Sequence, residues 1–198
     1  MVISKFMHEF ILKEYAGGKG VNDSEGMFLA GFAADVPKDG IIVEVGSYRG
    51  QSAAYLAAGS KRDVNIYLVD LWDRDHLDLV SDENQYAVAG QSHLRVLLQH
   101  FKNMGLAHKI TCLQGLSADY AKMWNQGPID MLFIDGDHSY EGVKLDYEKW
   151  SPHVKKGGVI AFHDYSDRWH GVKQLISEIQ DELEFIDLVD RVWAGRKW

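Results

Sequence analysis

The sequence predicts an α/β fold in which a doubly wound, seven-stranded, mostly parallel sheet carries helices on both faces. Five short apolar runs, each bounded by glycine or polar residues, alternate with longer segments of helical spacing, which is the pattern of βαβ units. Two further strand-like runs near the C-terminus are separated by one residue. That link is too short for a parallel crossover, so these two strands should form an antiparallel hairpin.

The elements follow in chain order. Two helices, over residues 3–15 and 24–34, should lie over the sheet ahead of its first strand. The five apolar runs predict strands buried on both faces, at 41–45, 66–69, 110–113, 130–134 and 158–162. Segments of helical length lie between them, at 51–59, 84–104, 117–125 and 140–155. An amphipathic helix over 172–183 then precedes the hairpin strands 184–189 and 191–194.

The 198 residues suit a single domain, with residues 1–39 as an N-terminal helical cap and 40–198 as the sheet core. The net charge of −8 argues against a nucleic-acid partner. Charged residues interrupt the first 14 positions, and no stretch reaches the ~20 apolar residues of a spanning helix, so we expect a cytoplasmic protein with no membrane partner. The single cysteine, Cys112, lies in an apolar run and should be a small buried hydrophobe.

A candidate nucleoside site follows the first strand. Gly46 and Gly50 lie four apart in a turn between a strand and a helix, and Gly46 would let the backbone approach a ligand. The third glycine of the dinucleotide fingerprint is missing, which disfavours a pyrophosphate-bearing cofactor. Asp70 ends the second strand, where its carboxylate could accept both ribose hydroxyls. Together the two features favour adenosine binding.

The segment IIVEVGSYRGQSAAYLA resembles motif I of the class I S-adenosylmethionine-dependent methyltransferases, and IYLVDLW and CLQGLSADY resemble their second and third cofactor motifs. The resemblance covers about residues 24–195 and implies a Rossmann-like sheet with the terminal hairpin. It implies S-adenosyl-L-methionine as cofactor, with Asp70 on the ribose. The residues implied around the methionine part are Glu44, Gly46, Ser47, Tyr48 and Gly50, and those implied at the adenine are Leu71 and Ser117.

A second group of candidate residues follows the fourth and fifth strands. Asp135 ends the fourth strand, and the pair His163-Asp164 ends the fifth. In a parallel sheet both ends lie at the carboxyl edge beside the cofactor, and Asp137 and His138 follow within one turn. Oxygen ligands with one imidazole suit Mg²⁺, Mn²⁺ or a similar divalent ion. Each residue taken alone could instead cap a helix or pack in the core.

This stretch is similar to the methyltransferase family 24 group, which includes metal-dependent O-methyltransferases of macrolide sugars, and more distantly to catechol O-methyltransferase. The resemblance implies that Asp135, His163 and Asp164 hold a divalent cation, with Asp135 also bordering the cofactor, and that His138 is the general base. The first residue of the strand-5 pair is often acidic or apolar in such relatives. His163 departs from that pattern, and Asp137 could replace it.

The leading hypothesis is therefore a metal-assisted O-methyltransferase acting on a hydroxyl of a small molecule such as a sugar or polyol. The alternatives are a metal-independent N- or O-methyltransferase that uses His138 alone, a non-catalytic nucleotide-binding scaffold, and an NAD-dependent oxidoreductase, which the missing glycine and the hairpin disfavour. Residues 71–103 and the N-terminal helices should form the acceptor pocket, with candidate wall residues Trp72, His76, Tyr86 and Trp169. Dimerisation is common in such enzymes, and the sequence leaves a homodimer open.

Overall fold

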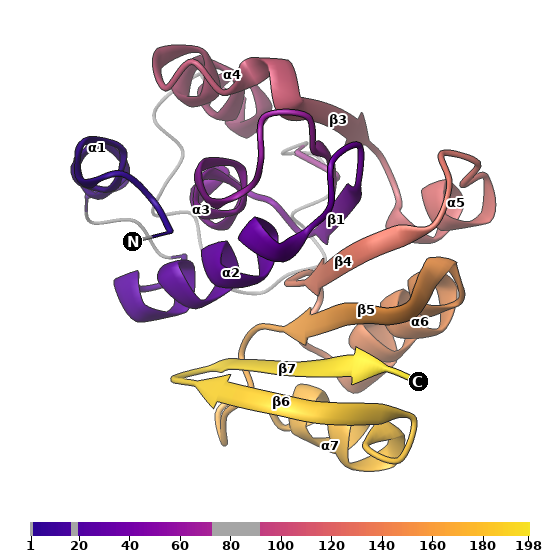
Figure 1. Cartoon of the computed structure of the whole chain (residues 1–198). Coiled ribbons are helices and arrows are strands. Elements are labelled where there is room, and N and C mark those ends of the chain that lie inside the picture. Colours follow the sequence, from indigo (N-terminus) through magenta and orange to yellow (C-terminus); the bar gives the residue numbers. More distant parts are fainter. Residues whose placement is uncertain (1, 17–19, 73–91) are drawn as a thin grey trace.

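A computed structural model describes residues 2–16, 20–72 and 92–198, and its centre is one seven-stranded sheet (Figure 1). The strand order is β3-β2-β1-β4-β5-β7-β6. The pairs among β1 to β5 are parallel, and the pairs β5–β7 and β6–β7 are antiparallel. The strands are β1 (Ile41–Val45), β2 (Asn65–Asp70), β3 (Ile110–Gln114), β4 (Ile129–Ile134), β5 (Val154–Phe162), β6 (Leu183–Val189) and β7 (Val192–Lys197). The predicted fold class is confirmed.

Seven α-helices in the described residues cover the two faces of this sheet. They are α1 (Lys5–Glu14), α2 (Asp23–Asp35), α3 (Gln51–Gly59), α4 (His93–Asn103), α5 (Ser117–Lys122), α6 (Tyr140–Trp150) and α7 (His170–Ile179). Buried residues of α1 to α4 join one hydrophobic cluster, and those of α5 to α7 join a second cluster on the opposite face. None of the described helices is both long enough and apolar enough to cross a membrane.

Several boundaries differ from prediction. The predicted helix 140–155 ends at Trp150, because Pro152 has no amide hydrogen for a further helical turn and Ser151–His153 forms a short 3₁₀ turn. Strand β5 consequently starts at Val154 and runs for nine residues. The helix predicted over 172–183 lies at His170–Ile179. Of the helix predicted over 84–104, the described part begins at His93, and residues 73–91 lie outside the described structure.

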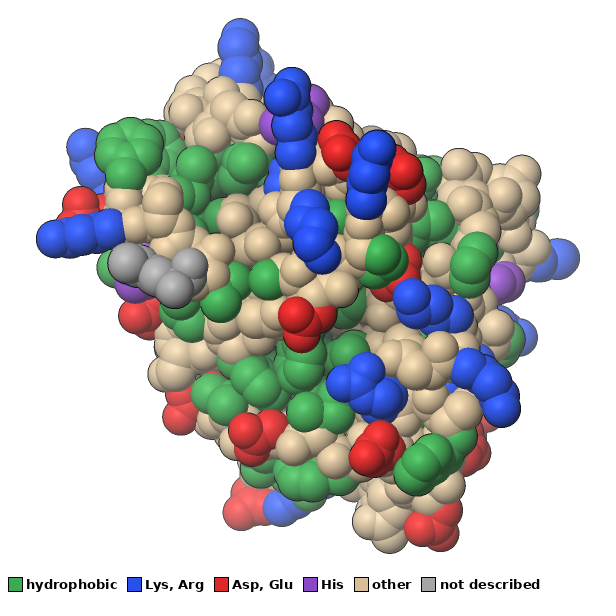
Figure 2. Space-filling view, in the orientation of Figure 1, with side chains coloured by type: hydrophobic (Ala, Val, Ile, Leu, Met, Phe, Trp, Pro, Cys, Tyr) green, Lys and Arg blue, Asp and Glu red, His purple; other side chains and the backbone are tan. Residues whose placement is uncertain are grey.

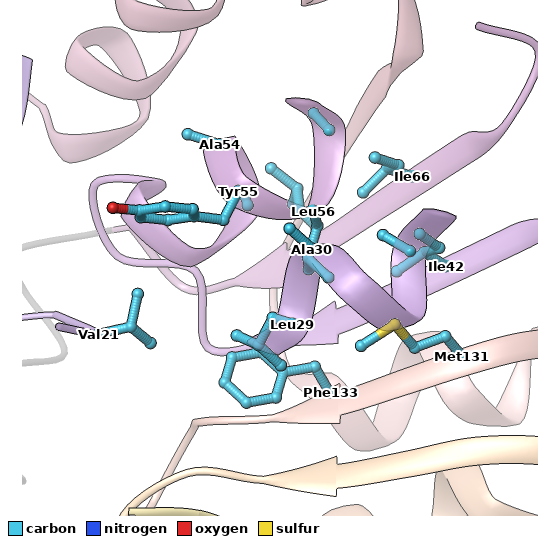
Figure 3. Packing of buried hydrophobic residues seen from close by; sticks show 14 of the residues in the cluster. Val21, Leu29, Ala30, Ile42, Ala54, Tyr55, Leu56, Ile66, Met131 and Phe133 are labelled. Atoms are coloured by element: carbon cyan, nitrogen blue, oxygen red, sulfur yellow. The ribbon is translucent and has the colours of Figure 1, made fainter. Parts of the chain in front are cut away.

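The N-terminal helix α2 is part of the core layer. It begins with a capping box, in which the Asn22 side chain accepts from the Glu25 amide and the Glu25 carboxylate accepts from the Asn22 amide. Leu29 and Ala30 are fully buried, and they lie between α3 and the central strands (Figure 3). Gly26 allows this close packing, because a Cβ there would overlap the Tyr55 ring.

Strand β1 is buried along its whole length, as expected of a strand covered on both faces. Ile42, Met131 and Phe133 pack on the α2–α3 side (Figure 3), whereas Val43 and Leu132 belong to the opposite cluster. On the face that carries α2, Figure 2 shows apolar side chains gathered among charged ones of both signs. The strand order reverses between β1 and β4, and crevices at such switch points are where open α/β sheets bind ligands.

Candidate active site

The carboxyl ends of the central strands are tied together by backbone hydrogen bonds that continue past the strands. The Gly46 amide donates to Val69 O at 2.9 Å, the Asp135 amide to Val45 O at 2.8 Å, and the His163 amide to Ile134 O at 3.0 Å. The residues that follow β1, β4 and β5 are therefore neighbours along one edge. The candidate site lies along that edge.

The turn after β1 needs its glycines for two reasons. Gly46 and Gly50 have φ of 85° and 86°, in the left-handed region that side chains disfavour. A Cβ on Gly46 would overlap the backbone of Asp135 and Gly136, so this glycine first of all lets the β1 and β4 ends come into contact. Tyr48, in the middle of the turn, also has a positive φ, of 45°.

Asp70 holds this turn in place. Its Oδ2 accepts hydrogen bonds from the Ser47 amide at 2.8 Å and the Tyr48 amide at 2.7 Å, and its Oδ1 accepts from the Trp72 amide at 2.9 Å. The indole of Trp72 donates in turn to Tyr48 O at 2.8 Å. Both carboxylate oxygens are thus engaged by the backbone, and Oδ1, which accepts one hydrogen bond, retains capacity for a second.

Glu44 is a fully buried carboxyl group beneath the turn. It accepts hydrogen bonds from the hydroxyls of Ser52 and Ser47, the latter at 3.2 Å. Burial raises the pKa of Glu44 to about 8, and the nearby Asp135 carboxylate acts in the same direction. Ser52, in the first turn of α3, was not singled out from the sequence. The sequence did contain a signal for Ser52, namely a polar residue at a position of the helix that faces the sheet.

The two residues expected at the adenine lie farther along the same edge. Leu71 follows β2 with about a third of its surface exposed, and its carbonyl accepts from the Gln114 amide group at 3.2 Å. Ser117 opens α5, and its hydroxyl accepts from the Trp150 indole at 2.7 Å. Of the candidate wall residues, Trp72 is buried beside the turn, and His76 and Tyr86 lie outside the described residues.

Three side chains converge at the ends of β4 and β5. One ligand atom each from Asp135, His138 and Asp164 lies within 4.8 Å of the others. His138 Nε2 is 2.8 Å from Asp164 Oδ2 and 3.7 Å from Asp135 Oδ1. Despite this proximity, the buried Nε2 makes no well-aligned hydrogen bond. This nitrogen therefore lies between two carboxylates without a well-aligned hydrogen bond to either.

Burial opposes protonation of His138, but Asp135 and Asp164 outweigh it and raise the pKa of this imidazole to about 9. The ring stacks on Trp169, with centroids 4.5 Å apart and an interplanar angle of 28°. The stacking fixes the plane of the imidazole and so the direction of Nε2. Trp169, proposed from the sequence as a pocket wall, therefore contacts a site residue directly.

His163 lies outside this group. Its ring is 5% exposed, with Nδ1 3.0 Å from Asp135 Oδ1 and Nε2 3.3 Å from Glu25 Oε2, so both nitrogens already face carboxylates. Burial would lower the pKa of His163, but Asp135, Asp164 and Glu25 raise it to about 11. Asp137, the alternative ligand, accepts from the Ser139 amide at 2.8 Å and also lies outside the group.

Two charged residues that sequence reasoning missed complete the site. Arg191, in the turn between β6 and β7, donates from Nη1 to Asp164 Oδ1 at 2.8 Å. Its Nε and Nη2 donate to Glu25 Oε1 and Oε2 at 3.1 and 3.2 Å. Glu25 and Arg191 are 166 positions apart, so no local pattern connects them. The only signal was the capping box, which identifies Glu25 as a helix-start residue.

Comparisons with known proteins bear on the family of this chain. The model of a family described as a methyltransferase domain matches residues 43–165. An uncharacterized protein of Sinorhizobium fredii is 27% identical over 135 residues, 66% of this chain and 14% of that protein. An uncharacterized protein of Acanthamoeba polyphaga mimivirus is 45% identical over 58 residues, 26% of either chain. The chain thus spans about a quarter or less of the length of these relatives.

Solved structures share the fold at low identity. An O-methyltransferase from Bacillus cereus in complex with SAH superposes with a TM-score of 0.71 and 17% identity, over 100% of this chain and 93% of that one. The O-methyltransferase TomG from Streptomyces achromogenes, involved in tomaymycin synthesis and solved with SAM, gives a TM-score of 0.69 and 14% identity, over 98% and 89%. At such identities the likeness is one of fold.

Proposed function

Because the chain belongs to the methyltransferase domain family, we propose that it transfers the methyl group of S-adenosylmethionine to a hydroxyl oxygen of a small molecule such as a sugar or polyol, with help from a divalent cation. One observation carries the proposal. Asp135, His138 and Asp164 converge at the carboxyl edge of the sheet, directly beside the glycine turn. The methyl donor and the groups that would activate an acceptor are thus adjacent.

The cofactor would lie across the switch point between β1 and β4. Its methionine part is assigned to the turn, with Glu44, Gly46, Ser47, Tyr48 and Gly50 around it. Asp70 already orders the turn through two backbone amides at Oδ2, and the remaining acceptor position on its Oδ1 suits a ribose hydroxyl. Leu71 and Ser117 would border the adenine, and Asp135 would lie between cofactor and acceptor.

The donor set fits a divalent cation of the Mg²⁺ or Mn²⁺ type. Two carboxylates and one imidazole are suitable ligands, and adjacent ligands about 2.1 Å from such an ion are about 3 Å apart. The separations at His138 Nε2, 2.8 and 3.7 Å, lie near that value, and this nitrogen otherwise has no aligned partner. We therefore place the ion on Asp135, His138 and Asp164 in preference to His163, whose Nδ1 and Nε2 are already within hydrogen-bond distance of Asp135 and Glu25.

A bound divalent cation would lower the pKa of the acceptor hydroxyl and orient its oxygen toward the methyl group. The residues then supply position: the turn holds the sulfonium, and the β4 and β5 ends hold the acceptor in line with it. His138 Nε2 has one lone pair, so it can ligate the ion or accept the substrate proton, but not both.

A metal-independent mechanism is the second candidate, and the 2.8 Å pair of His138 with Asp164 favours it. In that mechanism His138 is the general base. Its pKa of about 9 leaves it mostly protonated at neutral pH, so the rate should rise as the pH approaches 9. A metal-assisted enzyme would instead release that proton when the ion binds.

The test combines binding with turnover. Calorimetry should show heat with S-adenosylhomocysteine and none with NAD, and transfer of labelled methyl to a panel of sugars and polyols should stop after chelation and resume with Mg²⁺ or Mn²⁺. Transfer that survives chelation would select the metal-independent mechanism. Binding of NAD without binding of S-adenosylhomocysteine would overturn the methyltransferase proposal altogether.

A further inference from the structure

The turn between β6 and β7 reaches into the candidate active site through Arg191. This side chain is 40% exposed, yet its guanidinium contacts carboxylates from two other elements, Asp164 after β5 and Glu25 in α2. The three side chains come from the N-terminal helix, the end of a central strand and the C-terminal hairpin. Residues distant in sequence thus form one charged network beside the group Asp135, His138 and Asp164.

The Glu25 carboxylate fixes the position of the Arg191 side chain. Its carboxylate is fully buried and receives three hydrogen bonds from Arg191, from the amide, Nε and Nη2, all at 3.1 to 3.2 Å. The capping box anchors the same carboxylate to the start of α2 through the Asn22 amide at 2.7 Å. The Asn22 side chain also donates to Asp190 at 3.1 Å, next to Arg191. A bidentate arginine–carboxylate pair of this kind has a defined geometry.

The fixed guanidinium of Arg191 in turn orients the Asp164 carboxylate. Arg191 Nη1 occupies Oδ1 of this carboxylate, so that Oδ2 is the oxygen that faces His138. The backbone of Asp164 has a φ of 58°, a left-handed conformation that aspartate adopts at some energetic cost. The amide of the next residue, Tyr165, donates a hydrogen bond to Arg191 O at 3.0 Å. Side chain and backbone of Asp164 are thus both held by the hairpin turn.

We propose that Arg191, anchored by Glu25, is a positioning residue that makes Asp164 a one-oxygen ligand and thereby selects Mg²⁺- or Mn²⁺-type ions over Ca²⁺. Calcium takes six to eight oxygens and commonly uses both oxygens of a carboxylate, whereas the smaller ions take six ligands and keep positions for water or substrate. Freeing Oδ1 would therefore favour calcium. This inference rests on the metal site of the proposed function.

The experiment measures ion binding by the whole 198-residue chain without substrate. Mn²⁺ is titrated by electron paramagnetic resonance, Ca²⁺ by competition, and S-adenosylhomocysteine by calorimetry, for the wild type, Arg191→Met and Arg191→Lys. The matched control is Arg196→Met in the same hairpin, because the Arg196 guanidinium donates to Gly157 O at 2.9 Å, away from the candidate site. In Arg191→Met we expect Mn²⁺ binding about 10 to 100-fold weaker, the usual cost of losing an outer-shell partner.

We further expect the ratio of Ca²⁺ to Mn²⁺ dissociation constants to fall about 10-fold in Arg191→Met and less in Arg191→Lys, with S-adenosylhomocysteine affinity unchanged. An unchanged ratio in Arg191→Met would overturn the inference and leave the proposed function intact. Wild-type protein that binds S-adenosylhomocysteine but no Mn²⁺ would instead remove the metal from the proposed function. If Arg191→Met does not fold, Arg191→Lys and Glu25→Gln decide in the same way, since both weaken the anchor.

Discussion

Titratable residues at this site are buried or partly buried, and their protonation therefore bears on stability. Glu44 is the clearest example, because it is a fully buried carboxyl group whose contacts are serine hydroxyls rather than a cation. Among the residues proposed to take part in the reaction, His138 is the clearest example. Its ring is partly buried and stacks on Trp169, and its Nε2 faces two carboxylates. Each permits a prediction that one substitution can test.

Replacing Glu44 by glutamine should stabilise the protein increasingly as the pH rises. The pKa of Glu44 is about 8 when folded and about 4.5 when unfolded, so the folded state binds this proton more tightly. The contribution of Glu44 to wild-type stability is thus fully present below pH 4.5 and is lost as the pH rises through 8. At 1.36 kcal/mol per pKa unit, this loss in the free energy of unfolding is at most about 5 kcal/mol. The difference in Tm between Glu44→Gln and wild type should widen from pH 5 to pH 9.

The exposed Glu184 provides the matched control, because Glu184→Gln should give a Tm that follows the wild type at every pH. Parallel curves for Glu44→Gln and the wild type would show that Glu44 does not titrate between pH 5 and pH 9 and would contradict the prediction.

The two roles open to His138 predict different results for His138→Ala. If Nε2 ligates the ion, Mn²⁺ affinity should fall about 10 to 100-fold, while S-adenosylhomocysteine affinity holds. If His138 is only the general base, Mn²⁺ affinity should hold and kcat should fall about 10²-fold or more. His108, exposed in the 3₁₀ turn Ala107–Lys109, gives the control His108→Ala. Normal turnover and normal Mn²⁺ affinity in His138→Ala would remove this residue from the site.

At the scale of elements, the site depends on how strand ends meet. The loop after β1 touches the loop after β4 through backbone atoms, and Asp70 after β2 clamps the first of these loops. The hairpin β6–β7 and the start of α2 hold the end of β5. Regular elements thus bring the loops together, and direct loop-to-loop contacts set the positions of the functional groups.

Two glycine-to-alanine changes should therefore have opposite effects. Gly46→Ala should lower stability and abolish S-adenosylhomocysteine binding, because the new Cβ would overlap the backbone of Asp135 and Gly136 at a φ of 85°. Gly31→Ala is the control: it lies inside α2, its Cβ would meet nothing within 4 Å, and it should raise stability by about 0.5–1 kcal/mol. Thermal unfolding and calorimetry measure both. Full cofactor binding by Gly46→Ala would refute the close-contact explanation.

At the scale of the whole molecule, helices α1 and α2 are built into the fold. Helix α2 buries Leu29, Ala30 and Ala33 in the core shared with α3, and it supplies Glu25 to the charged network beside Asp164. The segment before α2 and the C-terminal hairpin also meet there, since Asn22 contacts Asp190. We propose that residues 1–198 form a single folding unit in which the N-terminal helices are a structural layer.

Deleting residues 2–39 should consequently leave a chain without a cooperative unfolding transition. The deletion exposes the α3 face around Tyr55 and Leu56 and leaves Arg191 without its buried anchor. Circular dichroism during heating measures the transition. Deleting residues 2–16 alone removes α1 and should give a less stable but still cooperative protein. A cooperative transition in the longer deletion, with S-adenosylhomocysteine still bound, would show that the N-terminal helices are dispensable.

The sequence by itself determined the class of fold, the order of its elements and the edge of the sheet that carries the site. Strand 41–45 and helix 51–59 have the observed bounds, because apolar periodicity and glycine preference are local properties. The placement of Asp135 and Asp164 at one edge also followed from the sequence, since parallel strands end together. The bounds of α6 and β5 were less well predicted, because a helix that ends at Pro152 passes directly into the strand.

Only the tertiary structure decided which side chains face one another. Neighbouring residues at a strand end point in different directions, so the sequence could not tell which nitrogens of His138 and His163 face the carboxylates of Asp135 and Asp164. Nor could it pair Glu25 with Arg191, whose contact exists only because α2 and the hairpin turn pack against the same end of β5. Local propensity specifies elements, whereas the direction of a side chain and a contact across 166 positions depend on how the elements pack.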